Sequence, residues 1–191
     1  MKNISEISIK EKLILAGIDE IEKNGIQGFS LRKVASKCGV SCAAPYKHFA
    51  NKTELITEII KYINEKWYIR QKKIVEAYDG NLRHQLTEIS LEYIRFLVEN
   101  PHFRSIIMLK DKKMDPQHVQ MKSELSLCTK NLIKKYCKSV GMPQKAELIK
   151  TFIIRSFIYG AALMFDNGEL EYNPENFELI ARTIDREFDL K

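Results

Sequence analysis

The sequence predicts an all-α protein, with an N-terminal three-helix helix-turn-helix domain at residues 1–50 and a larger helical domain at residues 51–191. Apolar residues recur at spacings of three and four along most of the chain, which is the period of an amphipathic helix. Gly, Pro and Asn stand at the breaks between these stretches, where helices begin or end. The sequence contains no strand-like alternation, internal repeat or low-complexity segment.

The first predicted helix begins with a capping box. Ser8 can accept a hydrogen bond from the backbone of the following turn, and Glu11 stands three residues later. The helix is expected to end near Asn24 and Gly25, because glycine adopts the left-handed conformation at little cost. Its inward-facing stripe consists of Leu13, Ala16, Gly17 and Ile21.

Residues 30–52 predict the helix-turn-helix itself. Ser30 can cap a short helix, and Gly39 stands where that helix must stop and the chain reverse. Ser41 can cap a second helix that runs to Phe49 and starts with small side chains, which allow a close approach to a surface. The apolar stripe of the first of these helices is Leu31, Val34, Ala35 and Cys38.

The charge pattern of this stretch predicts that the second helix approaches a DNA surface. No Asp or Glu occurs from Gln27 to Lys52, and Tyr46 and His48 can donate hydrogen bonds to phosphate oxygens. A second helix set steeply against the first is placed to enter the major groove. The alternative is a helical hairpin whose basic face is exposed to water. The basic residues are Arg32, Lys33, Lys37, Lys47 and Lys52.

The rest of the chain predicts further helices. A second capping box, Asn51 with Glu54, opens a long helix over 51–77 that links the two domains. Asn173 and Pro174 are typical of a helix start and open the last helix. The other predicted segments are helices over 82–100, 117–140, 144–165 and 174–188, a short segment over 101–109 and an exposed loop over 110–116.

The helix-turn-helix stretch resembles the DNA-binding signature of the TetR family of transcriptional repressors. The resemblance covers about the first quarter of the chain and implies a homodimer that presents two recognition helices to successive major grooves of a palindromic operator. It also implies a repressor that a small-molecule effector releases from DNA. The sequence shows no secretory signal, so we expect a cytoplasmic protein. The residues that carry the resemblance are Phe29, Ser30, Leu31, Arg32, Val34, Ala35, Cys38, Gly39, Val40, Ser41, Tyr46, His48, Phe49, Lys52 and Leu55.

The same resemblance implies which side chains contact DNA. Tyr46, His48 and Lys52 are the candidates for phosphate contacts. Pro45 departs from a regular helix, because it has no N–H to donate to the Ser41 carbonyl. Small apolar side chains offer few hydrogen bonds, so thymine methyl groups and DNA shape are expected to contribute to specificity. The candidates for base edges are Arg32, Cys42, Ala43, Ala44 and Lys47.

The two C-terminal helices predict a dimer interface. The helix over 144–165 is apolar around most of its circumference, and the helix over 174–188 is strongly amphipathic. Together they carry more apolar surface than one subunit easily covers. The alternative is burial in the core of the single subunit. The predicted interface residues are Phe157, Gly160, Ala161, Met164, Phe177, Ile180 and Ile184.

Bulky, adaptable side chains in the larger domain predict an effector pocket, walled by the helices that begin near 51, 82, 117 and 144. The alternative for each of them is ordinary core packing. Arg155 lies among apolar residues, so it pairs with an acid, faces water or binds an anionic group of the ligand. The predicted effector residues are Trp67, Tyr93, Phe96, Phe103, Met108, Met121, Phe152, Arg155 and Phe157.

The sequence argues against an enzyme or a membrane protein. It has no Gly-rich phosphate loop, His-Glu-x-x-His or Gly-x-Ser-x-Gly motif, so we expect no catalytic residue, cofactor or metal. We also expect no membrane span, since no apolar run approaches about 20 residues. The net charge of +6 favours an anionic partner. The alternative to an effector-released repressor is a constitutive DNA-binding protein, or a redox-responsive one acting through Cys42.

Overall fold

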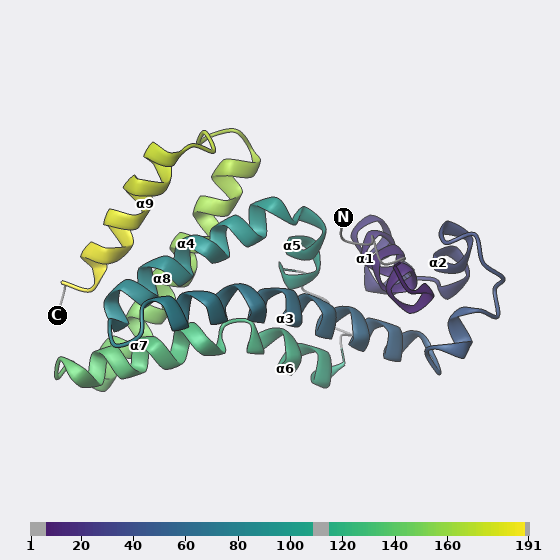
Figure 1. The fold of residues 1–191 in the computed structure, drawn as a ribbon, viewed down its shortest axis with the longest axis horizontal. Helices are drawn as coiled ribbons and strands as arrows, with labels where there is room; N and C mark the ends of the chain where they lie inside the picture. The colour runs from purple at the N-terminus through teal and green to yellow at the C-terminus, as the bar shows by residue number, and fades with distance from the viewer. Residues whose placement is uncertain (1–6, 109–114, 190–191) are drawn as a thin grey trace, which may run out of the picture. The chain divides into compact units, whose positions relative to one another are not determined.

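The computed structural model describes residues 7–108 and 115–189. This part of the chain forms nine α-helices and one short 3₁₀ helix without any strand, which confirms the predicted all-α fold class (Figure 1). The loop predicted at 110–116 lies almost entirely outside the described residues. The chain divides into two compact units, one of residues up to 65 with 102–122, the other of residues 66–101 with 123 onwards. The domain boundary at 50/51 stays a prediction.

The first unit is built on α1 (Ile9–Gly28) and α2 (Leu31–Lys37). Ser8 caps α1 as predicted, since its hydroxyl accepts a hydrogen bond from the Glu11 amide at 3.1 Å. Gly25 has a φ of 64° inside α1, so the regular helix ends where the sequence predicts. Ser30 precedes α2 in an extended conformation, but its side chain makes no capping hydrogen bond.

The long helix α3 (Lys52–Ala77) begins in the first unit and ends in the second. Asn51 caps it by accepting from the Glu54 amide at 3.0 Å, and the Glu54 carboxylate accepts from the Ala50 amide. In the first unit α3 is joined to α6 (Pro116–Glu124), because His118 bonds to Thr57 at 2.8 Å. The short helix α5 is Pro101–Met108.

The second unit is organised around α4 (Leu82–Glu99). This helix contacts α7 (Leu127–Ser139), α8 (Gln144–Asp166) and α9 (Pro174–Glu187). Buried apolar side chains along α4 form the core that these helices share. These side chains are Leu86, Ile89, Ile94 and Leu97. The C-terminal part of α3 joins the unit through Trp67, which is fully buried.

The single helix predicted over 117–140 is wrong, because the chain breaks at residues 125–126 into α6 and α7. The indole N–H of Trp67 donates to the Leu125 carbonyl at 2.9 Å. The Ser126 hydroxyl donates to the Ser123 carbonyl at 3.0 Å, a local bond that competes with the helical pattern. The bond from Trp67 to the Leu125 carbonyl and the bond from Ser126 to the Ser123 carbonyl therefore stabilise the chain where the helix is interrupted.

Helix α8 is long and apolar enough by composition to cross a membrane, which the sequence did not lead us to expect. One face of it packs on α4, α7 and α9. The other face exposes Leu148, Phe152 and Leu163. The high hydropathy of α8 thus arises from a core face and an exposed apolar face on one helix.

Candidate nucleic-acid interface and ligand pocket

The chain after α2 forms a tighter turn than the sequence predicts. Gly39 has a φ of 65° and reverses the chain after α2. The second helix predicted over 41–49 is reduced to a 3₁₀ helix at Pro45–Lys47. This helix has a bond that spans three residues, from the His48 amide to the Pro45 carbonyl at 3.0 Å. Pro45 accounts for this, because it cannot supply the N–H that an α-helical bond to Ser41 requires.

Most of the predicted DNA-contacting side chains lie on the exposed surface of this segment. Tyr46 is 59% exposed, and Lys52 is half-buried with its ammonium 5.7 Å from the centre of the Phe29 ring. Ala44 is half-buried, and the other predicted contact residues, Arg32, Cys42, Ala43, Lys47 and His48, are exposed. Among the described residues, no carboxylate pairs with Arg32, Lys47 or Lys52, so these cations are available to phosphates.

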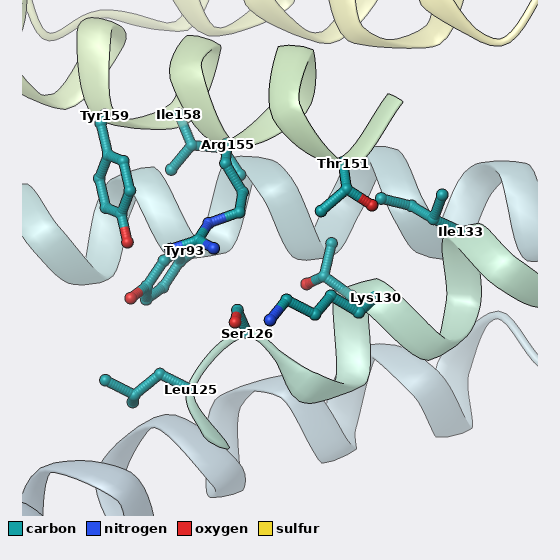
Figure 2. A pocket seen from close by; sticks show the side chains of 10 residues that line it. Tyr93, Leu125, Ser126, Lys130, Ile133, Thr151, Arg155, Ile158 and Tyr159 are labelled. Carbon is teal, nitrogen blue, oxygen red and sulfur yellow. The ribbon is translucent and has the colours of Figure 1, made fainter. Parts of the chain in front are cut away.

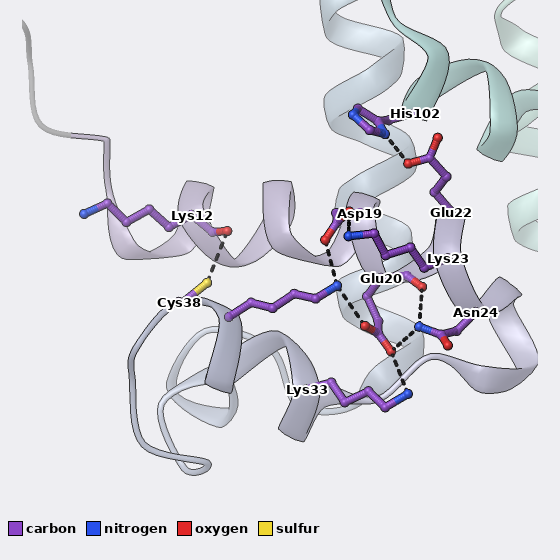
Figure 3. A network of polar contacts seen from close by, with 10 residues as sticks. Lys12, Asp19, Glu20, Glu22, Lys23, Asn24, Lys33, Cys38 and His102 are labelled. Atoms are coloured by element: carbon purple, nitrogen blue, oxygen red, sulfur yellow. Dashed lines mark hydrogen bonds and ion pairs between the residues drawn. The ribbon is translucent and has the colours of Figure 1, made fainter.

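Two other cations of the basic stretch are already neutralised by α1 (Figure 3). Glu20 is 1% exposed and pairs with Lys37 at 2.9 Å and with Lys33 at 3.4 Å. Lys37 also pairs with Asp19 at 2.7 Å, and Asp19 in turn pairs with Lys23 at 2.9 Å. Lys33 and Lys37 therefore hold α2 against α1 and contribute less to the charge facing a ligand.

These pairs shift the acidity of both carboxylates. Hydrogen bonds from Lys23 and Lys37 lower the pKa of Asp19 to about 2. Burial tends to raise the pKa of Glu20, but hydrogen bonds from Lys37 and Lys33 outweigh it and lower that pKa. Both side chains are therefore anionic at neutral pH. The stretch from Gln27 to Lys52 contains no acidic residue, but Asp19 and Glu20 of α1 lie beside two of its lysines.

The two cysteines of the segment lie in different environments. The Cys38 thiol donates to the Lys12 carbonyl at 3.4 Å, and burial raises its pKa (Figure 3). Cys42 is exposed. The described residues contain no cluster of His, Cys, Asp and Glu side chains suited to a metal ion.

A narrow pocket lies between α4, α7 and α8 in the second unit (Figure 2). The space open to the centre of a water molecule is about 10 Å³, which is room for about one water. Burial raises the pKa of Tyr93 well above its usual value, and the neighbouring Tyr159 hydroxyl, hydrogen-bonded to it, adds to the effect. Tyr93 is therefore a neutral hydroxyl group. The lining residues are Tyr93, Leu125, Ser126, Thr129, Lys130, Ile133, Thr151, Arg155, Ile158 and Tyr159.

Of the predicted effector residues, Tyr93 and Arg155 line this pocket. Trp67 and Phe96 are buried. The centre of the Trp67 ring lies 4.6 Å from that of Tyr93 and 5.5 Å from that of Phe96. They support the pocket wall rather than form it. Of the rest, Phe103, Met108 and Met121 belong to the first unit, Phe152 is 71% exposed, and Phe157 is half-buried outside the pocket lining.

The sequence reasoning missed the polar residues of the pocket. It selected bulky side chains, whereas the lining also includes Ser126, Thr129, Lys130 and Thr151. The one local signal was Ser126, because a serine within an apolar helical pattern can break the helix.

The predicted interface residues divide between the core and the surface. The single chain buries Ala161, Phe177, Ile180 and Ile184, and the rings of Phe165 and Phe177 stack with centres 5.0 Å apart. These four are already packed within the subunit. Gly160 and Met164 are exposed, and Phe157 is half-buried. The larger exposed apolar residues of α8 and α9 are Leu148, Ile149, Phe152, Leu163 and Leu179.

Comparison with known proteins relates the N-terminal part of the chain to a known family. Residues 13–59 match the family described as bacterial regulatory proteins, tetR family. Nucleoid occlusion factor SlmA of Aliivibrio fischeri is 23% identical over 178 residues, which cover 88% of this chain and 89% of that protein.

Solved structures share the fold over nearly the whole chain. A TetR family transcription regulator from Marinobacter aquaeolei VT8 matches with a TM-score of 0.73 at 19% identity, over 93% of this chain and 94% of that one. The transcriptional regulator FadR from Bacillus subtilis, in complex with stearoyl-CoA, matches with a TM-score of 0.67 at 15% identity, over 93% and 96%. The helix-turn-helix part of the chain therefore matches the TetR family of DNA-binding transcriptional regulators, and the fold of the whole described chain is the fold of solved members of that family.

Proposed function

We propose that this protein is a cytoplasmic, homodimeric repressor that leaves its operator when a small molecule binds between α4, α7 and α8. The observation that carries the proposal is the pocket of the second unit, lined by both apolar side chains and convergent polar groups. FadR, which has the same fold, is described in complex with stearoyl-CoA. A ligand-binding second unit is therefore compatible with this architecture.

We assign the DNA contacts to the exposed side of α2, to the segment that follows it and to the first residue of α3. Lys47 and Lys52 neutralise phosphates, and Tyr46 donates its hydroxyl to a phosphate oxygen. Arg32 is the candidate for a base edge, because its guanidinium can make two parallel hydrogen bonds to guanine. Ala43 and Cys42 are small enough to let the backbone approach thymine methyl groups.

Release follows from a difference in affinity between two conformations. A ligand that binds more tightly to a conformer with misplaced recognition segments shifts the population away from DNA. A coupling free energy of about 1–3 kcal/mol lowers DNA affinity roughly 5- to 150-fold. Helix α3 is continuous from the first unit into the second and is the covalent route for this coupling.

A second candidate is a DNA-binding protein without an effector. It is favoured by the small volume of the pocket and by the likeness to SlmA, which is named a nucleoid occlusion factor. Such a protein would keep its DNA affinity in the presence of any small molecule.

The two candidates are separated by selecting bound fragments from genomic DNA and then measuring affinity for the best site. Fluorescence anisotropy with a panel of amphipathic compounds reads out release directly. An effector-released repressor loses affinity at least fivefold with some member of the panel. Affinity that no compound changes favours the constitutive protein.

A further inference from the structure

Two cations that line the pocket lack the ion pairs found elsewhere in the second unit. Lys130 comes from α7 and Arg155 from α8, and neither pairs with a carboxylate among the described residues. By contrast, Arg70 pairs with Glu92 and Glu99, and Arg83 pairs with Asp185 and Asp189. No acidic residue lines the pocket. An unneutralised pair of cations at one cavity favours an anion.

Hydroxyl groups surround these cations. Figure 2 shows the Arg155 side chain extending from α8 towards Tyr93, with Lys130 and Ser126 on the opposite wall. The Arg155 guanidinium lies 5.8 Å from the centre of the Tyr159 ring. Tyr93 remains protonated because burial raises its pKa, and its hydroxyl is hydrogen-bonded to that of Tyr159. This pair has two hydroxyl protons and uses one of them internally, so one remains for an anion. Helix α7 also begins here, and its N-terminus adds a positive partial charge.

The pocket adjoins a larger groove that can hold the rest of a ligand. The groove has a volume of about 530 Å³ and shares Lys130 and Thr151 with the pocket. Leu148 adds an apolar side chain, Lys145 a further cation and Glu147 one carboxylate. Leu125, Ile133 and Ile158 make the pocket wall itself partly apolar. A ligand suited to both spaces carries an anionic group on an apolar body.

We propose that the effector is an anionic amphiphile whose carboxylate or phosphate group is bound by Arg155 and Lys130. Arg155 presents a planar fork to two anion oxygens, and Lys130 adds a point charge from the facing helix. The hydroxyls of Thr129 and of the hydrogen-bonded pair Tyr93 and Tyr159 complete the hydrogen bonds to the anion. This inference rests on the proposed effector-released function and names the ligand class for that same pocket.

The test compares three probes that share an apolar chain and differ in the head group: octanoate, octyl phosphate and octanol. Binding to the full-length protein is measured by calorimetry and by the fluorescence of Trp67, the only tryptophan of the chain. Trp67 packs on Tyr93 and bonds to Leu125, two pocket residues, so a bound ligand changes its surroundings. At least one anionic probe is expected to bind tenfold or more tightly than octanol.

Substitutions of Arg155 and Lys130 then test whether these two cations cause the preference for anionic probes. Arg155→Met and Lys130→Met should each weaken binding of the preferred anion about tenfold and leave octanol unchanged. Lys134→Met on the exposed side of α7 and Arg182→Met on the surface of α9 are the matched controls. A preference for octanoate identifies a carboxylate ligand, and a preference for octyl phosphate identifies a phosphate ligand.

Equal affinity for octanol and the anions, no binding of either anion at millimolar concentration, or an unchanged preference in Arg155→Met would overturn the inference. DNA affinity is measured separately with the same probes. Anion binding that leaves DNA affinity unchanged would support the proposed ligand class and contradict effector-controlled release. Release from DNA by octanol alone would support the proposed function and contradict the proposed ligand class.

Discussion

At the scale of single residues, the network of Asp19 and Glu20 determines which cations remain for DNA. Glu20 is almost fully buried, and Lys33 and Lys37 supply the charges that make this burial tolerable. The sequence could not predict this pairing, because it depends on the packing of α2 against α1. What the sequence did predict at this scale is local, such as the Ser8 cap and the turn at Gly39.

The lowered pKa of Asp19 predicts an acid dependence of stability. The folded protein has an Asp19 pKa of about 2, compared with an ordinary value of 3.8, so the pair stabilises the fold above pH 3.8. This stabilisation is lost as the pH falls from 3.8 towards 2. Asp19→Asn should therefore lower the melting temperature at neutral pH but differ little from wild type near pH 2.

Melting curves from pH 2 to pH 7, followed by circular dichroism, give the measurement. Asp79→Asn in the turn after α3 serves as the control, since Asp79 is exposed and its carboxylate accepts a local hydrogen bond from the neighbouring Gly80 amide. A constant difference between Asp19→Asn and wild type across the whole range would contradict the assignment.

At the scale of elements, the helix ends were predictable and the helix breaks were not. The helix caps at Ser8 and Asn51 are encoded within four residues. The break between α6 and α7 depends on Trp67, which lies 58 residues before Leu125. The 3₁₀ turn is an intermediate case. Pro45 indicates it locally, but the Ser41 cap predicted a full helix as far as Phe49.

The 3₁₀ turn and α2 should contribute differently to DNA binding. Lys47 has no carboxylate partner in the described chain, so Lys47→Ala should remove about one phosphate contact and reduce the slope of log affinity against log salt by about one. Lys37→Ala should leave the slope nearly unchanged, because Lys37 already pairs with Asp19 and Glu20.

Anisotropy titrations from about 50 to 200 mM salt give both slopes. Thermal melting is measured in parallel, since loss of Lys37 also weakens the packing of α2 on α1. If Lys37→Ala reduces the slope as much as Lys47→Ala does, Lys37 contacts phosphate in the complex and exchanges its partners on binding.

At the scale of the whole molecule, α8 has an exposed apolar face that a second subunit would cover. Most residues of the predicted interface do not belong to this face. Phe152 and Leu163 are eleven residues apart, which is about three helical turns, so they lie on the same face. Gly160 lies near this face, and an added Cβ there would meet no neighbouring atom within 4 Å in the single chain. A second subunit would cover this face by close helix packing.

Leu163→Arg should place an unpaired charge in that interface and convert the dimer to a monomer. Leu163 is 52% exposed in the single chain, so the substitution should leave the fold of the subunit intact. Sedimentation velocity measures the assembly, and circular dichroism checks the helix content. Ile69→Arg, at an equally exposed site on α3, is the control. An unchanged dimer for Leu163→Arg would remove this face of α8 from the interface.

The neutralisation of Lys33 and Lys37 has a consequence for gene control. With few cations free to bind phosphate, one recognition segment holds DNA weakly at physiological salt. For the proposed dimer, occupancy of an operator then requires both half-sites to be bound together, which raises the effective concentration of the second segment. Under the proposed function, repression therefore depends steeply on the number of protein copies per cell, and a modest change in synthesis switches the regulated genes.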